Sequence, residues 1–148
     1  MELSPLRPQQ SGVFRAPRFP QTLAALRKEA QRTRCAWISV DLHGVGDEAG
    51  MLEACARQLR FPRRYARNWN AFSDAVNDLS WQGAPGFVLE LENVDGPAQH
   101  APQALEAALE ILRAAAEAWC ARNTTFVVLL DYAPPRLAVE PFPEPPLD

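Results

Sequence analysis

The sequence is poor in the residue types that most often carry catalysis or hold metal ions. It contains 2 histidines and 3 cysteines, and its segment "HGVGDEAG" lacks both the spacing and the lysine of a phosphate-binding loop. His43 falls in a turn between an expected strand and an expected helix, and His100 falls in an expected loop. Neither can be tied to a serine or cysteine nucleophile. The sequence therefore predicts no catalytic residue, no metal site and no cofactor.

Long hydrophobic runs are also absent, which argues against membrane insertion and export. The opening "MELSPLRPQQ" has neither an apolar run nor a cleavage site after one, and no later segment approaches membrane-spanning length. The cysteines are odd in number and lack metal-ligand spacing, as expected of free thiols in a reducing compartment. They are Cys35, Cys55 and Cys120. We therefore expect a cytoplasmic protein of one domain with no membrane contact.

The charges are unevenly distributed along the chain. Residues 1–36 hold seven Lys or Arg against two Glu, or +5, which leaves eight against sixteen, or −8, for residues 37–148. An acidic body disfavours nucleic acid as the main ligand and favours a basic partner, whose approach it would accelerate.

Proline marks both ends of the chain. Residues 1–20 contain four prolines and are expected to form an arm without a core, although Val13 and Phe14 could dock. Residues 133–148 form a proline-rich tail that is expected to be extended rather than packed. The folded domain is therefore expected over residues 21–132.

Between these ends, the hydrophobic pattern alternates between strand and helix. "CAWISVDL" at residues 35–42 predicts a buried strand, "GFVLELE" a second and "TTFVVLLDY" a third that is covered on both faces. Helices are predicted over residues 21–34, from an Asp47 cap to Leu59, and over residues 102–122. This order predicts an α/β fold in which helices pack on a three-stranded parallel sheet, with an extra helix at the N-terminus.

Two strand carboxylates suggest an alternative function. Glu90 and Glu92 lie on one face of the second strand and could act as an acid/base pair if a concave pocket lay between the strand ends. The interpretation that we favour is that they face water or pair with arginines.

The most informative segment is "RFPRRYARNWNAFSDAVNDLSW", residues 60–81. Its apolar residues recur at helical spacing, and a polar stripe recurs at the same spacing on the other side. Asn68 is the expected N-cap of this helix. The stripe uses short Asn, Ser and Asp side chains, which lose little rotamer entropy and can dock against a flat partner. Short polar residues also cap and turn, so the stripe alone leaves both interpretations open.

This segment resembles the signature of the barstar-type ribonuclease inhibitors. The order of strands and helices in that family also fits residues 36–131. The resemblance implies a compact α/β inhibitor without catalytic activity, which binds a bacterial ribonuclease inside the producing cell and plugs its active site with a helix and the preceding loop. The matching residues are Phe61, Pro62, Tyr65, Asn68, Trp69, Ala71, Asp74, Asp78 and Leu79.

The resemblance also implies which residues bind the partner. The aspartate matching Asp74 stands in for a substrate phosphate among the basic residues of the nuclease. The positions that line the same contact or fix its geometry are Arg64, Tyr65, Asn68, Asn70 and Ser73. The expected function is therefore that of an inhibitor or immunity protein, and the expected partner is a basic nuclease or another toxin protein.

Several residues depart from the family pattern. Asn70 stands in place of an aspartate, Ala66 in place of a glycine, and Ser73 where the best-known member has an aromatic residue. Residues 61–82 carry three arginines against two aspartates, or +1, on a surface that would face a basic enzyme. These arginines support an alternative, an RNA-associated or regulatory module in which the inhibitory role is lost. They are Arg63, Arg64 and Arg67.

Overall fold

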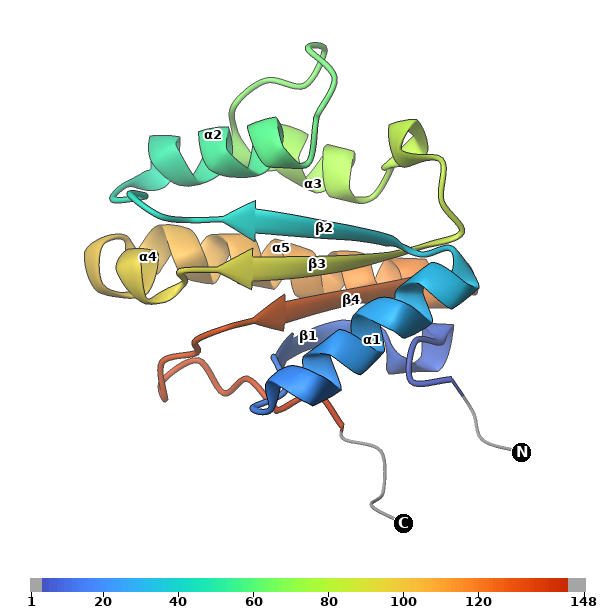
Figure 1. Ribbon diagram of the computed structural model, residues 1–148. Coiled ribbons are helices and arrows are strands. Elements are labelled where there is room, and N and C mark those ends of the chain that lie inside the picture. The colour runs from blue at the N-terminus through green and yellow to red at the C-terminus, as the bar shows by residue number, and fades with distance from the viewer. Residues whose placement is uncertain (1–3, 144–148) are drawn as a thin grey trace.

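The computed structural model describes residues 4–143 as a parallel sheet with helices on both of its faces (Figure 1). The strand order is β1-β4-β3-β2, and all three pairings are parallel. The strands are β1 Gly12–Arg15, β2 Ala36–Asp41, β3 Gly86–Glu92 and β4 Thr125–Leu130. The helices are α1 Pro20–Thr33, α2 Glu48–Gln58, α3 Trp69–Val76, α4 Asp95–His100 and α5 Pro102–Ala121, with short 3-10 turns at Pro8–Gln10 and Ser80–Gln82.

The prediction of three strands is wrong, because the N-terminal arm supplies a fourth. β1 pairs in parallel with β4, and Val13 lies opposite Val128. Val13 is buried, in keeping with the expectation that it could dock, but Leu6 is buried as well, so the expectation that the rest of the arm has no core is wrong at Leu6. A four-residue strand between prolines has no local signal of its own, since it forms only by pairing with the free edge of β4.

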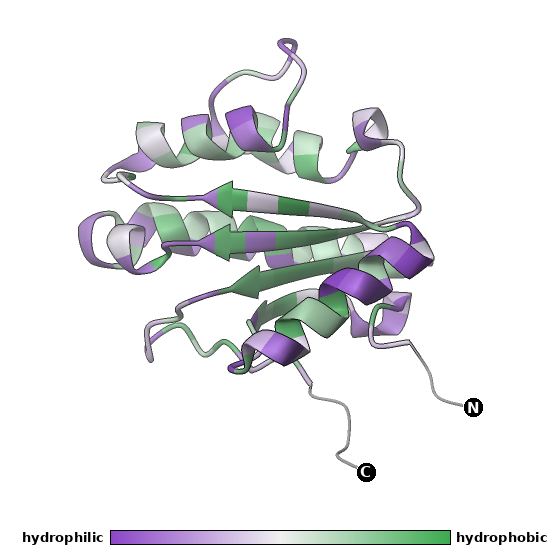
Figure 2. Ribbon diagram, viewed as in Figure 1, coloured by the Kyte–Doolittle hydropathy of each residue, from purple (hydrophilic) through white to green (hydrophobic). Residues whose placement is uncertain are grey.

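The two central strands are buried on both faces. Every residue of β4 is buried, as its continuous apolar run predicted. One face of the sheet packs against α2, α3 and α5, which hold the larger hydrophobic cluster. The other face is covered by α1 in front of the sheet (Figure 1), and the strands between these layers are largely hydrophobic (Figure 2).

The strand β2 lies at the edge of the sheet, so its predicted burial is wrong. Only Val40 is buried, and Ser39 and Asp41 are exposed. The side-chain amide of Gln58 accepts from Asp41 N at 2.6 Å and donates to Asp41 O at 2.7 Å. These bonds occupy the outward backbone groups of Asp41, and a side chain in this position limits pairing with another strand.

In its described residues, 133–143, the tail forms no helix and contains a turn closed by Leu137 N donating to Pro134 O, and it is packed, so the prediction of an unpacked tail is wrong there. Residues 144–148 of the predicted tail and residues 1–3 of the predicted arm lie outside the described residues. Arg15 N donates to Glu140 O at 2.8 Å, and Phe142 N donates to Arg15 O at 2.9 Å. The Phe142 ring is 3% exposed and meets Phe14 edge to face, with 5.2 Å between centroids. Phe142 therefore joins Leu6 and helix α1 in what we call the second layer, on the face of the sheet opposite α3.

The helix starts follow their predicted caps. Asp47 Oδ1 accepts from Gly50 N at 2.7 Å at the start of α2, and Asn68 Oδ1 accepts from Ala71 N at 2.8 Å at the start of α3. Helix α4 was not predicted, because its six residues include a glycine and a proline. Among residues 4–143, no helix combines the length and the apolar character that crossing a membrane requires.

Candidate functional site

The loop before α3 and the helix itself, residues 61–78, form a surface that we call the loop–helix surface. The inner side of α3 packs into the core through Phe72, Ala75 and Val76. Its outer side presents Asn70 and Asp74, which are both exposed. This division follows from the helical spacing of apolar and polar residues.

Asp74 is the uncompensated carboxylate of this surface. It belongs to none of the ion pairs within residues 4–143. It lies in the second turn of a helix that is capped at its start and packed along its inner side, so its backbone is fixed. An exposed carboxylate on a fixed backbone can meet a cation without first breaking an internal contact.

A cluster of aromatic rings supports the loop from below. The rings of Phe61, Tyr65 and Trp81 lie with centroids 5.8 to 6.1 Å apart, and Phe61 continues the cluster to Phe72 at 6.0 Å. Trp81 Nε1 donates to Leu59 O at 3.0 Å, which ties the cluster to the end of α2. Such pairs contribute beyond their buried area, so the loop rests on a defined base.

Asp78 binds the loop rather than standing free. Its Oδ2 accepts from Tyr65 Oη at 2.9 Å and from Arg64 Nη2 at 3.2 Å. The hydrogen bond from Tyr65 is the main cause that lowers the pKa of Asp78 below its usual value, with further contributions from Ser80 and Arg64. The Arg64 guanidinium also lies over the Tyr65 ring, 4.9 Å from its centroid.

A second carboxylate reaches the loop from α2. Arg67 Nε bonds Glu53 Oε2 at 2.9 Å, and Arg67 Nη1 donates to Tyr65 O at 3.2 Å. Glu48, also on α2, accepts from Trp69 Nε1 at 2.6 Å. The net charge of +1 given by residues 61–82 does not include these two glutamates, because they lie earlier in the chain, on α2.

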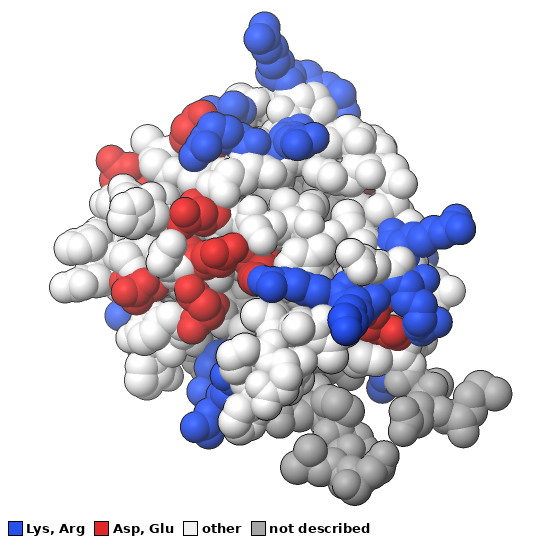
Figure 3. Space-filling view, viewed as in Figure 1, with Lys and Arg blue, Asp and Glu red and all other residues white. Residues whose placement is uncertain are grey.

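Two of the three loop arginines therefore have internal partners. Arg64 pairs with Asp78 and Arg67 with Glu53, whereas Arg63 is exposed and takes part in none of the ion pairs in the described part of the chain. Figure 3 shows basic side chains at the top of the molecule with acidic ones beside them, over α2 and the following loop.

The structure divides the predicted contact residues into two groups. Asn70 and Asp74 are exposed on α3. Asn68 uses its side chain as the cap, Tyr65 is half-buried, and Arg64 is held by Asp78. Ser73 is also half-buried on α3. Sequence reasoning matched Asp78 to the family signature but gave it no role in the contact, and it missed Glu53 and Glu48, which bind Arg67 and Trp69 from α2 and had no signal in the sequence.

The carboxylates proposed for an acid/base pair are arranged for a different role. Glu90 is 4% exposed and is bonded to Arg27 of α1 through both oxygens, at 2.6 and 2.8 Å. The favoured interpretation, pairing with arginine, is confirmed for Glu90. Glu92 is half-buried at the carboxyl end of β3.

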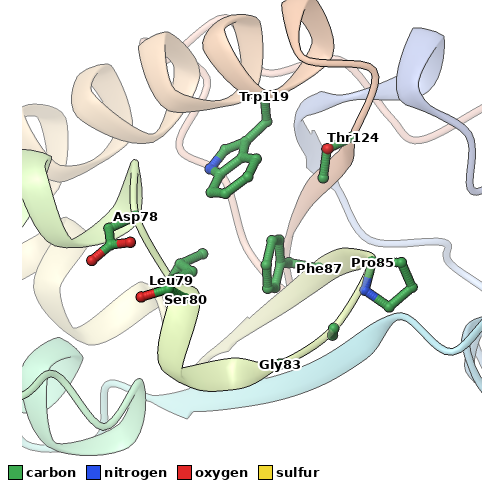
Figure 4. Close-up of a pocket in the computed structure, with 9 residues that line it drawn as sticks. Asp78, Leu79, Ser80, Gly83, Pro85, Phe87, Trp119 and Thr124 are labelled. Carbon is green, nitrogen blue, oxygen red and sulfur yellow. The ribbon is translucent and has the colours of Figure 1, made fainter.

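A cleft of about 350 Å³ opens at the other end of β3 (Figure 4). The rings of Trp119 and Phe87 form its wall, and Asp78 lies at its rim. It lies at the amino end of β3, whereas Glu92 ends that strand, so it does not bring Glu90 and Glu92 together around a substrate. Within residues 4–143, no three Asp, Glu, His or Cys side chains gather where they could hold a metal ion.

Two comparisons with known proteins were informative in different ways. The search of curated proteins gives no match, whereas the scan of family models gives one family. A family model described as Barstar (barnase inhibitor) matches residues 35–131, which is more than half of the chain and runs from the residue before β2 to the residue after β4. The loop–helix surface lies inside the matched residues, and β1, α1 and Phe142 lie outside them. The chain therefore belongs to the barstar family of barnase inhibitors.

Proposed function

We propose that this protein inhibits a ribonuclease by covering its active site with the loop–helix surface, and that Asp74 is the anchor of the contact. The observation that carries the proposal is the exposed carboxylate of Asp74, which stands on a capped and packed helix outside all ion pairs of residues 4–143. A ribonuclease binds the phosphates of RNA through cationic side chains, and a carboxylate can take the place of a phosphate among them.

The energetics favour a carboxylate that is free before binding. Truncating one member of a buried, hydrogen-bonded charge pair at an interface costs about 2 to 5 kcal/mol, because the other charge is left without a partner. Asp74 would form such a pair without giving up an internal one. Asn70 lies one turn before Asp74 on the same exposed side and offers a neutral amide for hydrogen bonds.

The arginines of the loop are less of an obstacle than their number suggests. Arg64 and Arg67 carry their own countercharges in Asp78 and Glu53, so a basic active site would meet two ion pairs instead of two bare cations. Arg63 remains, and a cognate nuclease that tolerates it would have an acidic or open rim beside its phosphate site.

The biological setting that fits this activity is that of an immunity protein. An inhibitor of a ribonuclease-type toxin protects the producing cell when it meets the toxin before export, which assigns it to the cytoplasm. The acidic charge of residues 37–148 would accelerate its encounter with a basic toxin at low ionic strength.

The test begins with capture. Wild-type protein and Asp74→Arg are used side by side to retain proteins from the lysate and secreted fraction of the source cell, and what each retains is assayed for RNA cleavage. We expect the wild type alone to retain a small basic nuclease and to suppress its activity when added in excess. Retention of the same nuclease by Asp74→Arg would contradict the anchor role.

RNA binding is the competing outcome. An RNA-associated module would need Arg63, Arg64 and Arg67 free for phosphates, whereas two of them are paired. If RNA were retained equally by wild type and Asp74→Arg, with an affinity that fell steeply with salt, the inhibitor proposal would be replaced by this alternative.

A further inference from the structure

The loop between α2 and α3 is rich in arginine and is held by carboxylates of the elements that flank it. Residues 62–67 form neither helix nor strand, and they contain three arginines among six residues. A segment of this kind would sample many conformations if it were held only by its backbone. Two carboxylates from elements that flank it, Asp78 after α3 and Glu53 on α2, fix it from opposite ends.

Asp78 holds the first half of the loop through two different donors. Its Oδ2 receives the Tyr65 hydroxyl at 2.9 Å and the Arg64 guanidinium at 3.2 Å, and that guanidinium lies over the Tyr65 ring. The Tyr65 ring in turn packs on Phe61 and Trp81. The hydroxyl, the guanidinium and the ring therefore restrain one another. The lowered pKa of Asp78 is consistent with this contact, since both donors favour its charged form.

Glu53 holds the second half of the loop through Arg67. The guanidinium bonds the carboxylate at 2.9 Å and, through another nitrogen, the backbone carbonyl of Tyr65 at 3.2 Å. Arg67 precedes the cap residue Asn68, so this bridge also sets how the chain enters α3. Glu53 is more exposed than Asp78, with 58% against 36% of the side chain accessible, so its contribution is expected to be the smaller one.

We propose that Asp78 and Glu53 are positioning residues that hold the 62–67 loop in one conformation before any partner arrives. Their role in binding rests on the proposed function, because the loop they fix flanks Asp74. A loop that is already ordered loses less conformational entropy on association, so the same contacts give a higher affinity. The two arginines thus serve the loop internally and are not available as phosphate ligands.

A test without a partner uses trypsin, which cleaves after the arginines of the loop itself. Cleavage of native protein requires local opening, so its rate reports the population of the open loop. We expect Asp78→Asn to increase cleavage after Arg63 and Arg64 about tenfold, as loss of a charged acceptor shared by two donors implies. Tyr65→Phe keeps the ring and removes the hydroxyl, and it should give most of the same increase.

Matched variants separate the loop from the fold as a whole. Glu53→Gln should increase cleavage after Arg67 by a smaller factor, about threefold, in keeping with an exposed ion pair. Glu117→Gln, an exposed carboxamide substitution on α5, should leave all loop cleavage unchanged. The melting temperature of Asp78→Asn should stay within a few degrees of wild type, since exposed contacts add little to global stability.

The outcome decides the proposal independently of the nuclease. Unchanged loop cleavage in both Asp78→Asn and Tyr65→Phe would overturn it. With a captured nuclease, Asp78→Asn should weaken binding about tenfold while Asp74 remains in place. Increased cleavage together with unaltered affinity would refute the link to binding. Failure to capture any nuclease would refute the proposed function and leave the cleavage result in support of the loop's internal restraint.

Discussion

The loop–helix surface and the second layer lie on opposite sides of one sheet and are ordered by different kinds of contact. The loop–helix surface is polar, and its order comes from a cap, an aromatic base and two ion pairs near the surface. The second layer is apolar, and its order comes from burial of Leu6, Leu26 and Phe142 against the sheet. Exposed polar contacts leave groups available to a partner, whereas burial leaves none.

This difference implies that the second layer serves stability and the loop–helix surface serves binding. The second layer comes from residues outside the family match at 35–131 and covers one face of the sheet, while β1, also outside the match, pairs with the edge of β4. An uncovered hydrophobic face or edge invites association with other chains. We therefore expect most substitutions in the second layer to lower stability without altering binding. Most substitutions on the loop–helix surface should weaken binding with little effect on stability.

The largest effect on stability is expected at Phe142. Phe142→Ala removes a ring that is 3% exposed and should lower the free energy of unfolding by about 3 kcal/mol. Phe19→Ala makes the same change at a ring that is 49% exposed and should cost less than about 0.5 kcal/mol. Urea denaturation of both variants measures the difference. A similar cost at the two positions would show that the tail is not part of the core.

A somewhat smaller effect is expected at the ion pair beneath α1. Arg27→Met leaves the buried Glu90 carboxylate without its partner and should lower the free energy of unfolding by about 2 to 3 kcal/mol. The cost is smaller than for a fully buried pair because the Arg27 side chain is half exposed. Lys28→Met, at the neighbouring exposed cation, is the control and should cost little. Adding Glu90→Gln to Arg27→Met should restore part of the loss. No restoration would mean that the arginine acts through packing alone.

The cap of α3 is the one position on the loop–helix surface where we expect a substitution to lower both stability and partner binding. Asn68→Ala removes the acceptor for Ala71 N and should lower stability by about 1 kcal/mol. It should also weaken partner binding, because the helix that carries Asp74 begins there. Asn70→Ala, in the first turn of the same helix, should leave stability unchanged. Thermal unfolding measured beside binding for both variants tests the distinction.

The smallest effect is a pH dependence in the second layer. Hydrogen bonds from Arg32 first and from Ser4 second lower the pKa of Glu29 from 4.5 to about 2. A carboxylate with a lowered folded-state pKa stabilises the fold above its unfolded value and loses that contribution as the pH falls toward 2. The melting temperatures of wild type and Glu29→Gln should therefore differ at pH 7 and converge near pH 2. A constant difference would contradict the assignment.

Local features of the fold could be predicted from the sequence, and long-range ones could not. The caps at Asp47 and Asn68 and the buried run of β4 depend on neighbouring residues, so their patterns were sufficient. Strand β1 and the burial of Phe142 depend on pairing across more than a hundred residues, and their proline-rich surroundings suggested extended chain instead.

The same limit applies to the candidate site. Helical spacing predicted that Asp74 would face outward, because that depends only on α3. It could not predict that Asp78 binds Tyr65 or that Glu53 pairs with Arg67, since these contacts join residues 13 and 14 positions apart through a loop of irregular path. The charge of the surface was therefore misjudged from the segment alone.

The most direct measurement is the dissociation constant of the captured nuclease for wild type, Asp74→Ala and Glu110→Ala, with the last as a control that removes an exposed carboxylate from α5. We expect Asp74→Ala to weaken binding by about a hundredfold or more, as loss of one member of an interfacial charge pair implies, and Glu110→Ala to bind like wild type. Melting temperatures of the three proteins should agree. Equal binding by Asp74→Ala and wild type would contradict the claim that the loop–helix surface anchors the partner through this carboxylate.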